Sequence, residues 1–322
     1  MNHKDSARPT RHVLLYAYQR PKLTIQACES VLSWSELQRL VITIDGLRPT
    51  ASEDEVTWRN ETIQVSQQLA NDYENIEVKV WDTNIGLTEH IFRSIAYVLK
   101  SADSLIAIED DNLISVQGLN FLSSRVDNSE SPKIAAGFNK FLHFDYQFPQ
   151  LYRSTLFPVQ WTTALNKSMF AIVEDVWSKR EIELSVVQNR IHSLKGMSFL
   201  KRKRLISYWY KYFCTSMESP RHTDIVVQYA VFKAGIFYEV PLGDFVDDLA
   251  NLDWRGMNTR HNPIIRQVHR PRIYITPQGD ACAVCDLLGS RIEPSMWRQF
   301  KTSIRLRLFG VLSAPKRLTA QK

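Results

Sequence analysis

The stretch Ser104-Leu-Ile-Ala-Ile-Glu109-Asp110-Asp111-Asn112 decides the fold, because a run of apolar residues leads directly into three consecutive carboxylates. Short apolar runs of this kind are typical of strands that are buried on both faces inside an α/β sheet. Ligands of open α/β sheets bind beyond the carboxyl ends of the strands, which is where Glu109, Asp110 and Asp111 are expected to emerge. The stretch therefore predicts a buried strand with an acidic cluster at its functional end.

The three adjacent carboxylates repel one another, so we expect a positive partner to hold them together. Hard oxygen ligands suit Mg²⁺ or Mn²⁺, and a carboxylate-held Mg²⁺ commonly completes its shell with substrate phosphates. The alternative is that Asp110, Asp111 or Asn112 caps a helix that follows the strand. The stretch by itself leaves both interpretations open.

Strand-like and helix-like patterns alternate on the amino-terminal side of this stretch. Strands are predicted at residues 13–18, 40–44, 76–81 and 104–109, and helices at 24–32, 53–71 and 88–99. This alternation implies a mostly parallel sheet with right-handed crossovers. We therefore expect an α/β fold in which helices flank a mostly parallel central sheet. Beyond it we expect strands at 133–138 and 235–240, helices at 170–177 and from Thr223, and an acidic loop at 244–253.

Composition limits the class of protein. The chain has 322 residues, of which 44% are hydrophobic, so it can form one large domain or two intimate ones. Its formal net charge of +6 favours anionic partners. Because no apolar run could span a bilayer, the amino terminus is polar and only two of the four cysteines are close together, we expect a cytoplasmic protein.

Three other predicted strands end in residues that suit a nucleotide. Arg20 follows the first strand, Asp45-Gly46 the second, and Asn84-Ile-Gly86 comes after the third. A carboxylate such as Asp45 can accept hydrogen bonds from a base or ribose, and Arg20 can reach a phosphate or stack on a base. Each residue alone could be structural, since Asp-Gly is a common turn pair. Together with the acidic cluster they describe one cleft.

Four stretches resemble the Rossmann-like nucleotide-sugar half of glycosyltransferases with the A-type fold: Tyr16-Ala-Tyr-Gln-Arg20, Ile42-Thr-Ile-Asp45-Gly46, Asn84-Ile-Gly86-Leu87 and Ile106-Ala-Ile-Glu109-Asp110-Asp111. They are most similar to bacterial polysaccharide-type transferases of the large inverting family and to N-acetylglucosaminyltransferase I. The resemblance implies a transferase domain over residues 1–255, with a nucleotide-sugar half at 12–120 and an acceptor half at 121–255. A basic extension then occupies 256–322.

The resemblance also implies roles for individual residues. Arg20 and Asp45 would hold the nucleoside, and Asp111 would bind Mn²⁺ or Mg²⁺ directly. The remaining donor-site candidates are Asn84, Gly86, Arg93, Glu109 and Asp110, with Arg93 placed to add a positive contact to the diphosphate. Trp161 and Arg153 lie in the segment that corresponds to the acceptor side.

An inverting displacement needs a carboxylate base within reach of the acceptor hydroxyl. Asp224 is the first candidate, because it opens a helix after the acceptor segment, as the base does in similar enzymes. Asp247 and Asp248 are the other candidates. The alternative is that Asp224 only caps its helix or interacts with the helix dipole, and that the acidic loop is solvated surface.

We therefore expect a metal-dependent, inverting glycosyltransferase of cell-surface polysaccharide synthesis. It would move a sugar from a nucleotide diphosphate sugar to a glycan or lipid-linked acceptor. The alternatives are a sugar nucleotidyltransferase, a catalytically silent relative that binds glycans, and a nucleic-acid-binding protein that uses the basic stretch 195–213; no nucleic acid partner is expected. A set of basic residues is interpreted either as a solvated face or as a peripheral contact with an anionic membrane: Lys201, Arg202, Lys203, Arg204, Arg298, Lys301, Arg305 and Arg307.

Overall fold

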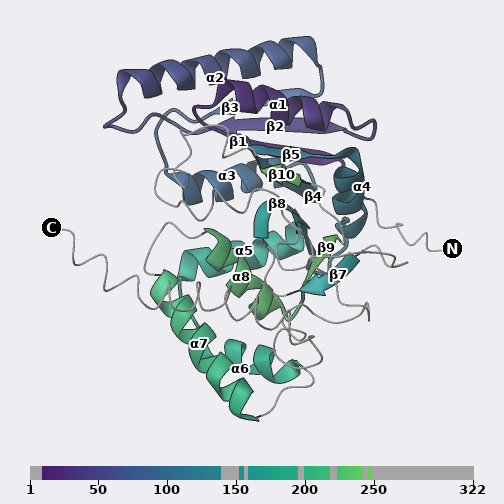
Figure 1. Cartoon of the computed structure of the whole chain (residues 1–322), viewed down its shortest axis with the longest axis vertical. Helices are drawn as coiled ribbons and strands as arrows, with labels where there is room; N and C mark the ends of the chain where they lie inside the picture. The colour runs from purple at the N-terminus through teal and green to yellow at the C-terminus, as the bar shows by residue number, and fades with distance from the viewer. Residues whose placement is uncertain are drawn as a thin grey trace, which may run out of the picture.

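The computed structural model describes residues 9–138, 152–155, 159–194, 199–217, 223–241 and 246–248. The predicted extension 256–322, with its basic residues, lies outside the described residues. Figure 1 shows a sheet with α1 and α2 on one side, α3, α5 and α8 on the other, and α6 and α7 furthest from α2. In the described part of the chain, no helix is long and apolar enough to cross a membrane.

The first half of the chain alternates strands and helices as predicted. Its strands are β1 (His12–Ala17), β2 (Arg39–Ile44), β3 (Ile76–Val80) and β4 (Ser104–Glu109), and its helices are α1 (Pro21–Leu32), α2 (Glu53–Asp72) and α3 (Leu87–Leu99). β1 pairs in parallel with both β2 and β4, and β2 pairs in parallel with β3. These four strands therefore end at one edge of the sheet, which we call the acidic edge because it carries Glu109, Asp110 and Asp111.

The second half adds strands to the same sheet and a separate pair of strands. Its strands are β5 (Asn112–Ile114), β6 (Ile134–Phe138), β7 (Tyr152–Thr155), β8 (Val159–Asn166), β9 (Tyr238–Pro241) and β10 (Val246–Asp248). Its helices are α4 (Val116–Arg125), α5 (Lys167–Lys179), α6 (Leu184–Ser193), α7 (Phe199–Met217) and α8 (Thr223–Ala234). The order β3-β2-β1-β4-β8-β6-β9-β7 makes one sheet, so the two predicted halves are continuous, whereas β5 and β10 pair as a separate two-stranded sheet.

The prediction of an α/β fold with a mostly parallel sheet is confirmed. The exceptions are β8, which runs antiparallel to both β4 and β6, and β7, which runs antiparallel to β9. Because β4 and β6 flank an antiparallel strand, they run in the same direction and begin at the same edge.

The central strands are buried on both faces, as their apolar composition predicts. Leu14 and Val41 face a core shared with α3, α5 and α8, whereas Leu15 and Ile42 face a core shared with α1 and α4. These four side chains are fully buried. Burial of such a side chain stabilises the fold by about 1.5–3 kcal/mol, so this sandwich fixes the positions of the strand ends.

One alternative interpretation and two local predictions were wrong. Asn112 begins strand β5 instead of capping a helix, and α4 is capped by Ser115, whose Oγ accepts a hydrogen bond from Gly118 N at 3.1 Å. Helix α1 begins at Pro21, which suits a first helical position because proline lacks an N–H. The predicted loop at 244–253 contains β10 at 246–248, which pairs with β5.

Candidate functional site at the acidic edge

The acidic edge is built where β4 ends beside β1. Tyr16 is the register partner of Glu109, and the ladder continues because Asp110 N donates to Tyr16 O at 3.0 Å. The preceding residues Ile106 and Ile108 are fully buried, which anchors the strand. The sheet therefore delivers consecutive carboxylates to one place, as the sequence predicts.

Arg20 supplies the positive charge that the acidic cluster requires. One guanidinium nitrogen lies 2.6 Å from Asp110 Oδ1, and another donates to Asp111 Oδ2 at 2.5 Å. Arg20 is the residue before Pro21, so the start of α1 fixes its backbone beside the carboxylates. All three side chains are largely buried. The chain thus carries its own counter-cation, a role that the sequence pattern alone assigned to a metal.

Burial and charge shift the titration of this cluster. Burial opposes the charge of Arg20, but the Asp110 and Asp111 carboxylates outweigh it and raise the pKa of Arg20 above its ordinary value. Burial raises the pKa of Asp110 to about 7, with Arg20 opposing and Asp111 reinforcing the rise. Burial also raises the pKa of Glu109 well above its ordinary value, and Asp111 and Asp224 add to that rise.

The donor set fits a divalent cation that takes few protein ligands. No group of three or more His, Cys, Asp or Glu side chains among the described residues could enclose a metal ion. The buried Oδ2 of Asp110 nevertheless has no hydrogen-bond partner, and Asp111 lies beside it. Mg²⁺ is commonly held by one or two carboxylates together with phosphates and water. Asp111 and Asp110 match that demand, so the fit depends on a phosphate-bearing ligand.

Asp45 joins the ends of β2 and β3. Its Oδ1 accepts hydrogen bonds from Gly46 N at 2.8 Å and Ile85 N at 3.0 Å, and its Oδ2 accepts from Asn84 Nδ2 at 3.0 Å and Gly86 N at 3.2 Å. A carboxylate offers about four acceptor positions, and this loop fills them. The structure brings the candidates Asp45, Asn84 and Gly86 together, with Asp45 organising the loop that begins α3.

Glycine suits two positions of this loop for two different physical reasons. A Cβ on Gly46 would lie 2.0 Å from the backbone carbon of Thr83, so no side chain fits there. Gly86 has open space around it but a φ of 81°, a left-handed conformation that favours glycine. Close packing of the two strand-end loops therefore requires the first glycine, and the turn into α3 favours the second.

Arg93 lies on the exposed side of α3. Its Nε donates to Glu89 Oε1 at 2.7 Å, one helical turn earlier. The other carboxylate oxygen of Glu89 accepts from Trp177 Nε1 at 3.1 Å. In this structure the partner of Arg93 is therefore Glu89. The contact between Arg93 and a diphosphate remains a prediction.

Asp224 approaches the acidic edge from α8. The neighbouring Thr223 donates through Oγ1 to Thr88 Oγ1 at 3.3 Å, which ties the start of α8 to the first turn of α3. Asp224 is exposed, and its charge contributes to the raised pKa of Glu109 after burial and Asp111. The structure therefore places Asp224 near Glu109.

The other predicted site residues lie on strands. Asp247 and Asp248 belong to β10, where they are the register partners of Leu113 and Asn112, immediately after the acidic cluster. Trp161 lies on β8, one residue beyond the pairing of Thr162 with Ile108, and therefore at the acidic edge. Arg153 lies on β7, which is separated from β4 by three strands, or roughly 20 Å. Only the backbone of these four predicted residues is described.

Sequence reasoning missed a polar network beside the ends of β1 and β2. Tyr18 donates through its hydroxyl to Glu55 Oε1 at 2.5 Å, and Arg48 donates to both oxygens of Glu55 at 2.9 and 2.5 Å. Arg48 holds the pKa of Glu55 below its ordinary value. Because these residues are 37 and 7 positions apart in the chain, no local sequence pattern marked them. An exposed guanidinium and a tyrosine ring thus flank the acidic edge.

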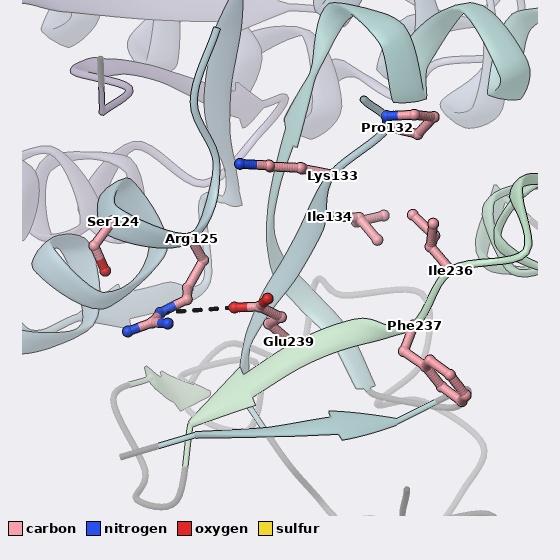
Figure 2. Close-up of a pocket in the computed structure, with 8 residues that line it drawn as sticks. All are labelled: Ser124, Arg125, Pro132, Lys133, Ile134, Ile236, Phe237 and Glu239. Carbon is pink, nitrogen blue, oxygen red and sulfur yellow. Dashed lines mark ion pairs between the residues drawn. The ribbon is translucent and has the colours of Figure 1, made fainter. Parts of the chain in front are cut away.

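A cavity of about 380 Å³ lies elsewhere (Figure 2). It is lined by Ser124, Arg125, Pro132, Lys133, Ile134, Ile236, Phe237 and Glu239. Figure 2 shows Glu239 of β9 pointing toward Arg125 of α4, with 3.7 Å between the charged atoms. Ile134 begins β6, so the cavity lies at the edge where β4 begins. It is therefore separate from the acidic edge.

Comparison with known proteins gives likenesses of fold at very low identity. No family model and no curated protein matches the chain. A mannosyltransferase from Pyrobaculum calidifontis in complex with GDP-Man and Mn²⁺ is 8% identical with a TM-score of 0.38, covering 70% of each chain. The inositol-1-phosphate CTP transferase from T. maritima is 13% identical with a TM-score of 0.37, over 73% of this chain and 86% of that one. HddC from Yersinia pseudotuberculosis is 12% identical with a TM-score of 0.33, over 50% of this chain and 79% of that one.

Proposed function

We propose that this chain is a glycosyltransferase that moves a sugar from a nucleotide diphosphate sugar to a hydroxyl group of a glycan or lipid-linked acceptor. One observation carries the proposal: Arg20, Asp110 and Asp111 form a largely buried charged cluster at the sheet edge, and the start of α8 brings Asp224 close enough to add to the raised pKa of the adjacent Glu109. Helix α1 brings Arg20 from one face of the sheet, and α8 brings Asp224 from the other. The arrangement combines a charged cluster that would bind the diphosphate with a separate carboxylate, Asp224, that would act as the base.

The cluster supports binding of an anionic donor. When bound, a divalent cation supplies neutralisation of the charge that develops on a diphosphate leaving group. Asp111, with Asp110 beside it, would hold that cation. Arg20 presents a planar fork of N–H donors, which suits phosphate oxygens as well as carboxylates. Its present carboxylate partners are therefore exchangeable for phosphate.

Asp224 supports the transfer step. The acceptor oxygen would form a bond to the anomeric carbon while the bond from that carbon to the diphosphate oxygen breaks, and the electron pair leaves with the diphosphate. Asp224 would take the acceptor's proton as a general base. Its exposed carboxylate is accessible to an incoming hydroxyl. Attack opposite the leaving group inverts the anomeric configuration.

A thermal-shift screen tests this proposal. The full chain would be heated with UDP, GDP, CDP, ADP or dTDP, and with their sugar conjugates, in the presence and absence of Mn²⁺. A ligand that binds only the native state, and whose free concentration is a hundred times its Kd, stabilises that state by about 2.7 kcal/mol. We expect one nucleotide diphosphate to raise Tm only with the cation. No shift with any of them would refute the proposal.

Product analysis separates the proposal from a nucleotidyltransferase. A glycosyltransferase releases a nucleotide diphosphate, whereas a nucleotidyltransferase joins a nucleoside triphosphate to a sugar phosphate and releases pyrophosphate. The segment Tyr18-Gln-Arg20-Pro21 after β1 lacks the glycines of a phosphate-wrapping loop, and Arg20 is bound to carboxylates. Pyrophosphate release with a sugar phosphate would contradict our assignment.

A further inference from the structure

Helices α6 and α7 form a hairpin whose surface differs from the rest of the molecule. Figure 1 shows the pair at the bottom of the view, on the opposite side of the sheet from α2. Helix α7 is anchored through one face: Phe213 is fully buried and its ring lies 5.2 Å from the rings of both Tyr229 and Phe232 on α8. Because this face of α7 packs against α8, the opposite face of α7 points away from the core.

The start of α7 exposes two large apolar side chains. Phe199 is 74% exposed and Leu200 is 68% exposed, which makes them the most exposed large hydrophobic residues in the described part of the chain. Arg202 donates to Leu194 O at 2.9 Å and so ties this turn to the end of α6. The two residues thus form an apolar tip on an anchored helix. Contiguous exposed apolar surface is a feature of interaction sites.

The hairpin itself, residues 184–217, carries charge of one sign. Residues 184–217 contain no aspartate or glutamate and include the following basic residues: Arg190, Lys195, Lys201, Arg202, Lys203, Arg204 and Lys211. This hairpin therefore carries more positive charge than the formal net +6 of the whole chain. On α7, Lys203, Arg204 and Lys211 are exposed and spaced along the outward face.

We propose that the start of α7 docks the protein on an anionic lipid surface, with Phe199 and Leu200 inserted between head groups and Lys203 and Arg204 on lipid phosphates. Basic residues beside apolar ones are the combination that binds such an interface, because charge attracts the protein and apolar burial retains it. The inference does not depend on the chemistry at the acidic edge. Nucleic acid would use the charges but leave the aliphatic Leu200 without a role, since bases stack on aromatic rings.

Vesicle flotation of the full chain tests the docking surface. Vesicles of phosphatidylcholine with about one third phosphatidylglycerol should carry the protein upward at low salt, and vesicles of phosphatidylcholine alone should not. Phe199→Ser/Leu200→Ser should lower binding by about tenfold or more, because the apolar anchor is lost. Lys203→Gln/Arg204→Gln, which leaves Phe199 and Leu200 in place, should also lower it by about tenfold.

Matched controls lie on other parts of the surface. Tyr73→Ser removes an apolar side chain that is 46% exposed at the end of α2, and Lys22→Gln/Lys100→Gln removes two exposed charges from α1 and the end of α3. Both should float like wild type. The proposal is overturned if wild type stays at the bottom at low salt, or if both α7 variants float like wild type. It is also overturned if wild type does not bind vesicles but binds single-stranded RNA or self-associates, and Phe199→Ser/Leu200→Ser abolishes that binding or self-association.

Discussion

The guanidinium of Arg20 lies 2.5 Å from Oδ2 of Asp111, across 91 positions of sequence. This pair occupies the carboxylate that the sequence pattern assigns to a metal ion. A divalent cation at this site would therefore share a carboxylate that Arg20 already holds. We expect an anionic donor that brings its own cation to change the partners of Arg20.

The first prediction concerns the loss of this internal cation. Arg20→Met removes the partner of two largely buried carboxylates and should lower the free energy of unfolding by about 3–5 kcal/mol. Urea denaturation at neutral pH measures the change. Arg20→Met/Asp111→Asn should recover part of the loss, because one uncompensated charge is removed. If Arg20→Met unfolds at the wild-type urea concentration, the ion pairs contribute nothing to stability.

The second prediction concerns metal binding in the same variant. Without Arg20 the carboxylates of Asp110 and Asp111 lack a counter-charge, so Mn²⁺ alone should raise the Tm of Arg20→Met by more than that of wild type. The control is Arg20→Met/Asp111→Asn, which should respond less. Equal shifts in all three proteins would mean that the cluster does not hold a cation.

The third prediction separates the transfer step from donor binding. Asp224→Asn should leave the nucleotide-induced Tm shift intact and lower the transfer rate by about 10²–10⁴-fold, because the general base is lost. Asp247→Asn and Asp248→Asn are the matched comparisons, since both lie on the strand beside the acidic cluster. If transfer survives in Asp224→Asn and disappears in one of these, the base is on β10.

The sequence predicted what local patterns determine. Apolar runs such as Leu40–Ile44 are buried strands, and their alternation with helices placed Asp45, Asn84 and Asp111 at one edge. The pairing of Arg20 with Asp110 and Asp111 could not be predicted, because it depends on how α1 packs beside β4. Strands β5 and β10 have three residues each, too few to show a period of two.

The fourth prediction concerns the loop held by Asp45. Asp45→Ala removes the acceptor of four hydrogen bonds and leaves partly buried N–H groups unpaired, so it should lower the free energy of unfolding by about 3 kcal/mol. Asn84→Ala removes one donor to the carboxylate, together with the 2.8 Å bond from the same amide to Gly46 O, and should cost about 1–2 kcal/mol. Urea denaturation compares them. Equal losses would show that the backbone N–H bonds contribute little.

The last prediction concerns pH and rests on His90, which packs edge-on against Tyr16 with 5.9 Å between the ring centroids. Burial lowers the pKa of His90 to about 4, although Asp45 opposes the shift. The unfolded chain binds the proton near its ordinary pKa of about 6.5, so neutral His90 contributes stability above that pH and loses it as the pH falls toward 4.

The raised pKa values of Glu109 and Asp110 act in the opposite direction, because those groups bind protons more tightly in the folded state. The effect of His90 is therefore isolated by comparing wild type with His90→Phe, which keeps a ring against Tyr16 but cannot titrate. Between about pH 7 and pH 5, wild type should lose about 2 kcal/mol more of its unfolding free energy than the variant. Urea titrations at both pH values measure the difference, and parallel losses in the two proteins would show that the pKa of His90 is not lowered in the folded state.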